Sequence, residues 1–220
     1  IASVYSIARI ADDCVDIFDV SSLKRKERLD YFIKKFWHHF NYNDKKKTLI
    51  NYEHNKNSDN IFNLSSPFIE KTIHESCKIK KDVVEKDEKE KGLRKTLNFG
   101  HTFAHAYEAT LGYSKKLNHG EAVILGMKTA LNFSLKHKLL KKTEHNSIIN
   151  HITKLGLPSK INNFFNLRDL NKILSFMLKD KKNHSDKISL VLLKKIGSPV
   201  INKEYSKTTL AIFLKNELTN

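Results

Sequence analysis

Residues Leu97–Gly112 read LNFGHTFAHAYEATLG, and residues Asn118–Met127 read NHGEAVILGM. His101 and His105 stand four residues apart, a spacing that puts both side chains on one face of a helix. His119 lies at the start of the second stretch, and it can fold back toward the first helix if the two helices pack antiparallel across their short connection. Two interpretations follow. The three imidazoles form a metal and acid–base site, or they are polar positions on two packed helices.

The two stretches predict consecutive helices. The first begins near His101 and ends at Gly112, and its alanines leave little side-chain bulk on its surface. The second begins after Asn118, a good N-cap residue, and Glu121 stands three residues later, as in a capping box. Residues 122–140 follow. The first of them place apolar side chains on nearly every face of the helix, which indicates a helix buried in a bundle.

Helical periodicity also dominates the neighbouring sequence. Upstream, a helix is predicted from Pro67 to Gly92, with the charge run EKDEKEK as its solvated end. Downstream, the pattern predicts helices near 144–155 and 168–179, a strand at KISLVLLKK, a turn at GSP, a partner strand at VINKEY and a closing helix at SKTTLAIFLKNEL. The fold class is therefore mainly α, a helical bundle with a small β hairpin near the C-terminus.

The first part of the chain has a different character. Residues 1–58 mix basic runs, aromatic residues and asparagines without clear periodicity, and we interpret them as an irregular or disrupted segment. Residues 59–220 are predicted to form one helical domain that binds a metal and a substrate. No glycine-rich phosphate loop such as GxGxxG is present, so no dinucleotide site is recognisable in the sequence.

The composition is strongly basic. Lys and Arg number 40 against 24 Asp and Glu, which gives 40 − 24 = +16. Such a charge attracts anions, including nucleic acids, but the abundance of lysine, asparagine and isoleucine also fits an AT-rich genome. The lysines are spread along the chain and no nucleic-acid motif appears, so no nucleic-acid partner is expected. A non-catalytic basic domain that binds anions or nucleic acid stays open as an alternative function.

Two further features concern the cellular location. Cys14 and Cys77 do not form a CxxC pattern, which argues for a reducing compartment. No window approaches the roughly 18 apolar residues of a membrane-spanning helix. A cytoplasmic protein without a membrane partner is expected.

Other polar residues cluster around the histidines in the sequence. Arg94 and Asn98 shortly precede the first histidine helix, and Lys80 lies on the helix before them. Together with the imidazoles they would make a cationic pocket rich in donors, suited to a small anionic and hydroxylated substrate. Taken one at a time, Arg94 fits an ion pair with Glu90 and Asn98 fits a helix cap.

The ordered motif RxxLNxGHTxxHAxE, followed by HGExxxxGM, closely resembles the C-terminal domain of the 3-dehydroquinate synthase family, which belongs to the sugar-phosphate cyclase group. The upstream SCKIKKDVVEKDEKEKG and the downstream MLKDKKN extend the resemblance over roughly residues 60–215. The resemblance implies a phosphate-eliminating lyase of the shikimate pathway, which leads to aromatic amino acids. Its substrate would be 3-deoxy-D-arabino-heptulosonate 7-phosphate, a small phosphorylated sugar acid, and its product 3-dehydroquinate. Another sugar-phosphate cyclase is the alternative.

The resemblance also implies cofactors and roles. In the family a divalent zinc or cobalt ion and NAD take part, the protein is a homodimer, and the helical domain follows a Rossmann-like NAD domain. Carried onto this sequence, the metal ligands are His101 and His119, and the catalytic residue for proton transfer is His105. The residues that match substrate-binding positions are Lys80, Arg94, Asn98 and one of Lys181 and Lys182.

The sequence departs from the family upstream. The NAD domain is absent from this chain, and the family's third metal ligand, a glutamate, has no match. Glu27 and Asp30 lie nearest but do not fit the pattern, so neither is assigned. Two explanations of this departure from the family pattern are open. One is a set of frame disruptions in the gene, for instance near Lys45–Lys47, and the other is true divergence of the segment. We therefore expect little or no synthase activity from this chain alone.

Overall fold

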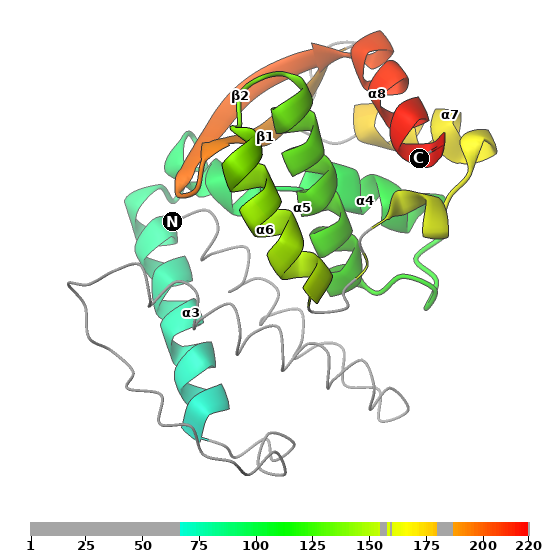
Figure 1. Ribbon diagram of the computed structural model, residues 1–220. Helices are drawn as coiled ribbons and strands as arrows, with labels where there is room; N and C mark the ends of the chain where they lie inside the picture. The colour runs from blue at the N-terminus through cyan, green and yellow to red at the C-terminus, as the bar shows by residue number, and fades with distance from the viewer. Residues whose placement is uncertain (1–66, 155–157, 159, 180–186, 220) are drawn as a thin grey trace.

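The structure is a computed structural model that describes residues 67–154, 158, 160–179 and 187–219 (Figure 1). The boundary predicted between residues 58 and 59 lies outside these residues. The elements, with 3₁₀ helices labelled η, are α3 Pro67–Lys86, η2 Leu93–Asn98, α4 His101–Thr110, α5 His119–Lys136, α6 Lys142–Lys154, η3 Ile161–Asn163, η4 Leu167–Asp169, α7 Leu170–Leu178, β1 Lys187–Lys195, β2 Ser198–Ser206 and α8 Lys207–Thr219. The predicted fold class, mainly helical with a hairpin near the C-terminus, is confirmed.

Helix α5 is the centre of the core. It contacts α4, α6 and β1, and its residues 122–127 are all buried. The helix begins as the sequence predicts, because the Glu121 carboxylate accepts a hydrogen bond of 3.0 Å from the backbone N–H of Asn118. This capping box satisfies a donor that the first turn of a helix would otherwise leave without a partner. The sequence signal at NHGE therefore fixes the start of α5 at His119, directly after the N-cap residue Asn118.

The β hairpin closes one side of α5 (Figure 1). Ile188, Leu190 and Leu192 alternate along β1 and are buried, as expected of a strand with one face on a core. The turn lies at Ile196–Gly197, slightly earlier than the predicted GSP turn, and Ser198 already belongs to β2. The reason is Gly197, whose φ of +78° supplies the left-handed conformation that a tight turn needs.

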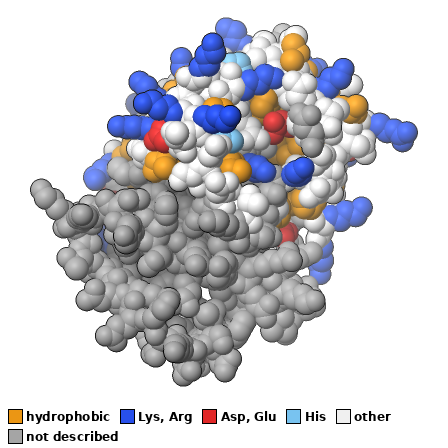
Figure 2. Space-filling view, viewed as in Figure 1, with side chains coloured by type: hydrophobic (Ala, Val, Ile, Leu, Met, Phe, Trp, Pro, Cys, Tyr) orange, Lys and Arg blue, Asp and Glu red, His pale blue; other side chains and the backbone are white. Residues whose placement is uncertain are grey.

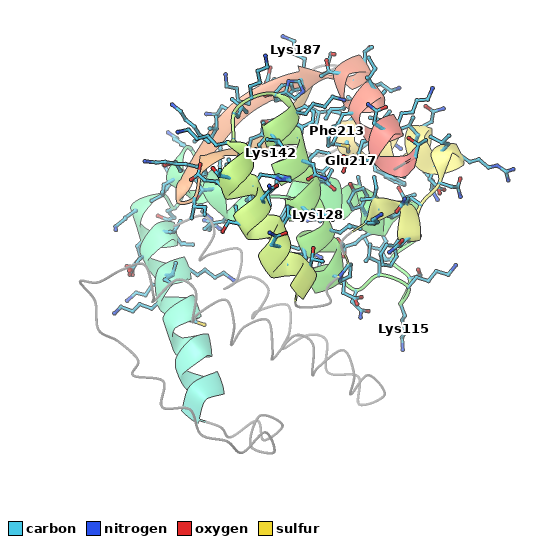
Figure 3. The ribbon with its side chains drawn as sticks, in the orientation of Figure 1. Lys115, Lys128, Lys142, Lys187, Phe213 and Glu217 are labelled. Carbon is cyan, nitrogen blue, oxygen red and sulfur yellow. The ribbon has the colours of Figure 1, made fainter. Side chains whose placement is uncertain are left out.

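A polar network joins α5 to the helices beside it. The Asn132 side-chain amide donates to Glu217 on α8 at 2.7 Å, and its carbonyl oxygen lies 2.7 Å from Nε2 of His145 on α6. Lys128 and Glu217 lie close together in this region (Figure 3). Burial lowers the pKa of Lys128, and the Glu217 carboxylate partly opposes that shift. These contacts fix the side of the bundle away from the histidine cluster.

Candidate functional site

Three imidazoles come together where α4 and α5 begin. His101 and His105 lie on α4, with ring centres 5.7 Å apart, and His119 is the first residue of α5. The ring centre of His119 lies 6.3 Å from that of His101 and 6.2 Å from that of His105. His101 is buried, His119 is half-buried and His105 is exposed. The predicted convergence of the three histidines is confirmed, with one imidazole in the core and one at the surface.

The spacing of the rings can be compared with that of zinc ligands. With Zn–N bonds of 2.0–2.1 Å, two imidazoles on one tetrahedral zinc have ring centres about 5 Å apart. All three observed separations exceed this by roughly an ångström, so the ring spacing is compatible with any two of the imidazoles on one ion after a small movement. Among the residues that the structure describes, no group of three or more His, Cys, Asp or Glu side chains could hold a metal.

A buried carboxylate backs one of these histidines. Glu108 lies on α4, is 9% exposed, and its Oε1 is 2.8 Å from Nδ1 of His119. On α4 the sequence positions of His101, His105 and Glu108 follow the i, i+4, i+7 spacing, so all three share one helix face. The site therefore has a polar face on α4 that is opposed by the first turn of α5.

Two glycines let α4 and α5 approach closely beside the site. Gly100 precedes α4 with a φ of +82°, and a Cβ placed there would lie 2.5 Å from the backbone nitrogen of Met127. A Cβ on Gly126 would lie 2.3 Å from the backbone oxygen of Gly100. Because both contacts are with backbone atoms, the two helices could not pack at this distance with any other residue at either position.

The segment before the site differs from its prediction. The helix α3 ends at Lys86, not at Gly92, so only the first two residues of the charge run, Glu85 and Lys86, form its solvated end. Instead the Asp87 carboxylate accepts backbone N–H groups of Lys91, Gly92 and Arg94 at 2.9, 2.7 and 3.0 Å. Such a side chain offers the backbone an alternative to the helical hydrogen bonds, which is why the helix stops there.

This loop positions two of the predicted substrate residues. Glu90 has a left-handed φ of +51°, and its Oε1 accepts a hydrogen bond of 2.7 Å from the side-chain amide of Asn98. Arg94 donates from its guanidinium to the backbone oxygen of Glu88 at 2.7 Å. Asn98 is thus held by Glu90, and Arg94 lies at the start of η2, two turns before the first histidine. The loop brings the amide and the guanidinium to the same end of α4.

Replacing Asp87 by alanine is expected to open this loop. The amides of Lys91, Gly92 and Arg94 lose their common acceptor, so their hydrogen exchange should speed up by roughly tenfold or more, with little change elsewhere. These backbone bonds lower the pKa of Asp87 below its ordinary 3.8. Because the pKa of Asp87 is depressed in the folded protein, the protection of the amides persists above pH 3.8. It is lost only as the pH falls through the lower pKa that Asp87 has in the folded protein.

Exchange rates measured by NMR between pH 2.5 and 5 check this prediction. Asp82→Ala removes an exposed acid from α3 and serves as the matched control, with unchanged exchange in the loop. Equal exchange rates in Asp87→Ala and in the unchanged chain would show that Asp87 does not hold the loop.

Of the remaining predicted residues, only one lies in the part of the chain that the structure describes. Lys80 lies half-buried on α3. Lys181 and Lys182 lie outside the described residues, as do Glu27 and Asp30. Their parts in a site stay predictions.

Sequence reasoning missed two acidic contacts. Glu108 stands inside the quoted motif, and its spacing from His101 and His105 was a usable signal. Glu90 was considered only as an ion-pair partner of Arg94, whereas its Oε1 accepts a hydrogen bond from Asn98. Only the three-dimensional course of the loop brings it to Asn98.

Comparisons with known proteins agree with one another. The family model described as 3-dehydroquinate synthase C-terminal matches residues 42–183. A 3-dehydroquinate synthase of Pelagibacter ubique (strain HTCC1062) is 60% identical over 179 residues, which are 79% of this chain and 49% of that protein. One from Bradyrhizobium diazoefficiens is 36% identical over 74% of this chain and 44% of its own length. The chain spans about half the length of the curated relatives it matches.

Solved structures show the same fold at low sequence identity. A 2-deoxy-scyllo-inosose synthase, complexed with carbaglucose-6-phosphate, NAD⁺ and Co²⁺, superimposes with a TM-score of 0.54 at 22% identity, over 68% of this chain and 41% of that chain. A 2-epi-5-epi-valiolone synthase from Streptomyces hygroscopicus, with NAD⁺ and Zn²⁺ bound, gives 0.55 at 18% identity, over 69% and 40%.

Proposed function

Because the chain belongs to the 3-dehydroquinate synthase C-terminal family, we propose that it provides the metal- and substrate-binding half of a 3-dehydroquinate synthase. The reaction is the conversion of 3-deoxy-D-arabino-heptulosonate 7-phosphate to 3-dehydroquinate and phosphate. The observation that carries the proposal is the group of three imidazoles, 5.7 to 6.3 Å apart, within the residues that the family model matches.

Each side chain has a task in this proposal. His101 and His119 would hold a divalent zinc or cobalt ion, which polarises substrate hydroxyl and carbonyl oxygens as a Lewis acid. His105 is exposed and stands beside both ligands, so it can accept or donate a proton at an atom of the substrate. Arg94, Lys80 and Asn98 would bind the carboxylate, phosphate and hydroxyl groups, for which guanidinium, ammonium and amide donors are suited.

The remaining parts of the active protein are also part of the proposal. NAD would be bound by a Rossmann-like half that the described residues do not include, and the third metal ligand would come from outside them as well. The proposed assembly is a homodimer in the cytoplasm. Within the described ranges no helix combines the length and apolar composition needed to cross a bilayer.

A hybrid enzyme tests the proposed function. Residues 67–220 of this chain replace the matching C-terminal residues of the Pelagibacter ubique synthase, which then supplies everything upstream. We expect the hybrid to release phosphate from the heptulosonate phosphate in the presence of NAD⁺, to lose this activity with a chelator and to regain it with Zn²⁺ or Co²⁺. A folded, metal-loaded hybrid that releases no phosphate would contradict the proposal.

Two alternatives give different outcomes in the same experiments. Another sugar-phosphate cyclase would form its product from a different sugar phosphate, which a product assay detects. A non-catalytic basic domain would bind duplex DNA in a salt-dependent manner that survives His101→Ala and His119→Ala. Lys and Arg side chains lie over the described part of the face seen in Figure 2, with uncharged side chains between them and few acidic ones.

A further inference from the structure

Glu108 has no role in the proposed reaction, although it lies directly against a metal-ligand candidate. The residue is 9% exposed and its Oε1 is 2.8 Å from Nδ1 of His119. Burying a carboxylate is costly unless strong hydrogen bonds compensate for the lost water. A short contact with a ring N–H provides such a bond. Glu108 and His119 therefore form a unit in which each side chain restrains the other.

The contact determines which ring nitrogen carries the proton. When the Glu108 carboxylate is ionised it only accepts hydrogen bonds, and Nδ1 of His119 is then the donor. A neutral imidazole protonated at Nδ1 has its lone pair on Nε2, and that nitrogen is the one that can bind a metal ion. The bond thus selects a tautomer as well as a position.

The ring of His119 also lies nearly parallel to that of His105. The two planes are 18° apart, with ring centres 6.2 Å from each other. Rotation of the His119 ring would break the bond to Glu108 and change this near-parallel arrangement. The bond between α4 and α5 therefore holds the ring at a defined angle.

We propose that Glu108 is a positioning residue, which holds His119 in the Nδ1–H tautomer with Nε2 directed to the metal and thereby strengthens binding of a divalent cation. The proposal rests on the proposed function in one respect, the assignment of His119 as a ligand. Outer-shell partners of this kind typically change metal affinity 10- to 100-fold. Glu108→Ala should therefore weaken zinc binding by about that factor.

The experiment has one measurement without metal and one with metal. In the metal-free full chain labelled with ¹⁵N-histidine, two-bond proton–nitrogen spectra report the tautomer of each ring, and His119→Ala identifies the signals of His119. We expect Nδ1–H in the unchanged chain and a shift toward Nε2–H in Glu108→Ala. Titration with Zn²⁺ alone then gives the affinity. Glu108→Gln keeps the size of the side chain and one acceptor oxygen, so it should recover part of the affinity.

A matched control separates positioning from folding. Glu217→Gln removes another half-buried carboxylate that accepts a hydrogen bond, far from the histidines in sequence, and it should change neither the His119 tautomer nor the zinc affinity. The proposal would be overturned by any one of three results. These are an Nε2–H tautomer of His119 in the unchanged chain, an unchanged His119 tautomer in Glu108→Ala, and undiminished zinc binding in Glu108→Ala. If the tautomer and the zinc affinity change as expected while the hybrid enzyme releases no phosphate, the proposed function fails and the role of Glu108 stands.

Discussion

Replacing Gly126 by alanine is expected to destabilise the domain by about 3 kcal/mol or more, the upper part of the range for overpacked cores. The added Cβ would lie 2.3 Å from the backbone oxygen of Gly100 and 2.9 Å from the backbone nitrogen of Ala104. No side-chain rotation relieves a clash with backbone atoms, so α4 and α5 must move apart. The gain of roughly 1 kcal/mol in helix propensity from glycine to alanine offsets only part of this cost.

Thermal unfolding measures the effect. A domain of this size loses about 2–4 °C in Tm for each kcal/mol, so a fall of about 6–12 °C is expected. Gly100→Ala should have a similar effect, because it combines a Cβ 2.5 Å from the Met127 nitrogen with a φ of +82°. A Gly126→Ala variant as stable as the unchanged chain would show that α4 and α5 are farther apart than in the structure.

Gly112 offers a matched control within the same helix pair. Its φ of +65° imposes the same strain on alanine, but a Cβ there meets nothing within 4 Å. Gly112→Ala should therefore cost only the roughly 1–2 kcal/mol of a left-handed non-glycine residue. The difference between Gly100→Ala and Gly112→Ala then isolates the cost of the close helix contact from the cost of the backbone conformation.

The close contact explains how the glycines in the motif serve the site. Gly100 immediately precedes His101, and Gly126 lies two turns after His119. When these backbones touch, the α4 face that carries His101 and His105 is brought to the first turn of α5. The sequence shows that the first helix has small side chains on its surface, but only the distance between Gly126 and Gly100 shows which positions tolerate no Cβ.

The parts of the fold that the sequence predicted well are those with local signals. Asn118 and Glu121 mark the start of α5 through a capping box, which depends on neighbours three residues apart. The alternation of Ile188, Leu190 and Leu192 predicts a strand with one buried face, and the structure has it. Such signals need no knowledge of distant contacts.

The parts that were wrong or missed depend on contacts that the linear pattern does not encode. The charge run has a helical composition, yet α3 ends at Lys86 because Asp87 binds three backbone N–H groups that follow it. The partnership of Glu108 with His119 joins residues on two helices across a loop. Periodicity places each residue on a face, but the pairing of faces follows from tertiary packing.

The three histidines should separate into two classes when each is replaced. The buried His101 and the Glu108-bound His119 fit as ligands, whereas His105 is exposed and is assigned to proton transfer by its match to the family motif. His119→Ala and His101→Gln should each weaken Zn²⁺ binding to the full chain by about 100-fold or more, which exceeds the effect of losing an outer-shell partner. Glutamine is chosen for the buried His101 because its size and polarity preserve the fold. His105→Ala should leave zinc affinity within a few-fold and, in the hybrid enzyme, lower kcat by about 10²- to 10⁴-fold, as expected for a lost general acid or base.

Isothermal titration with Zn²⁺ and phosphate-release kinetics of the hybrid measure the two effects separately. His145→Ala is the control, because His145 binds Asn132 on the other side of the bundle and should affect neither quantity. Metal binding requires neutral imidazoles, so zinc affinity should also weaken as the pH is lowered. An equal loss of zinc affinity in His105→Ala and His119→Ala would instead make all three imidazoles ligands of one ion. That result would require the nitrogens of the three rings to converge by movement of the exposed His105, which α4 permits only through a change of its side-chain rotamer.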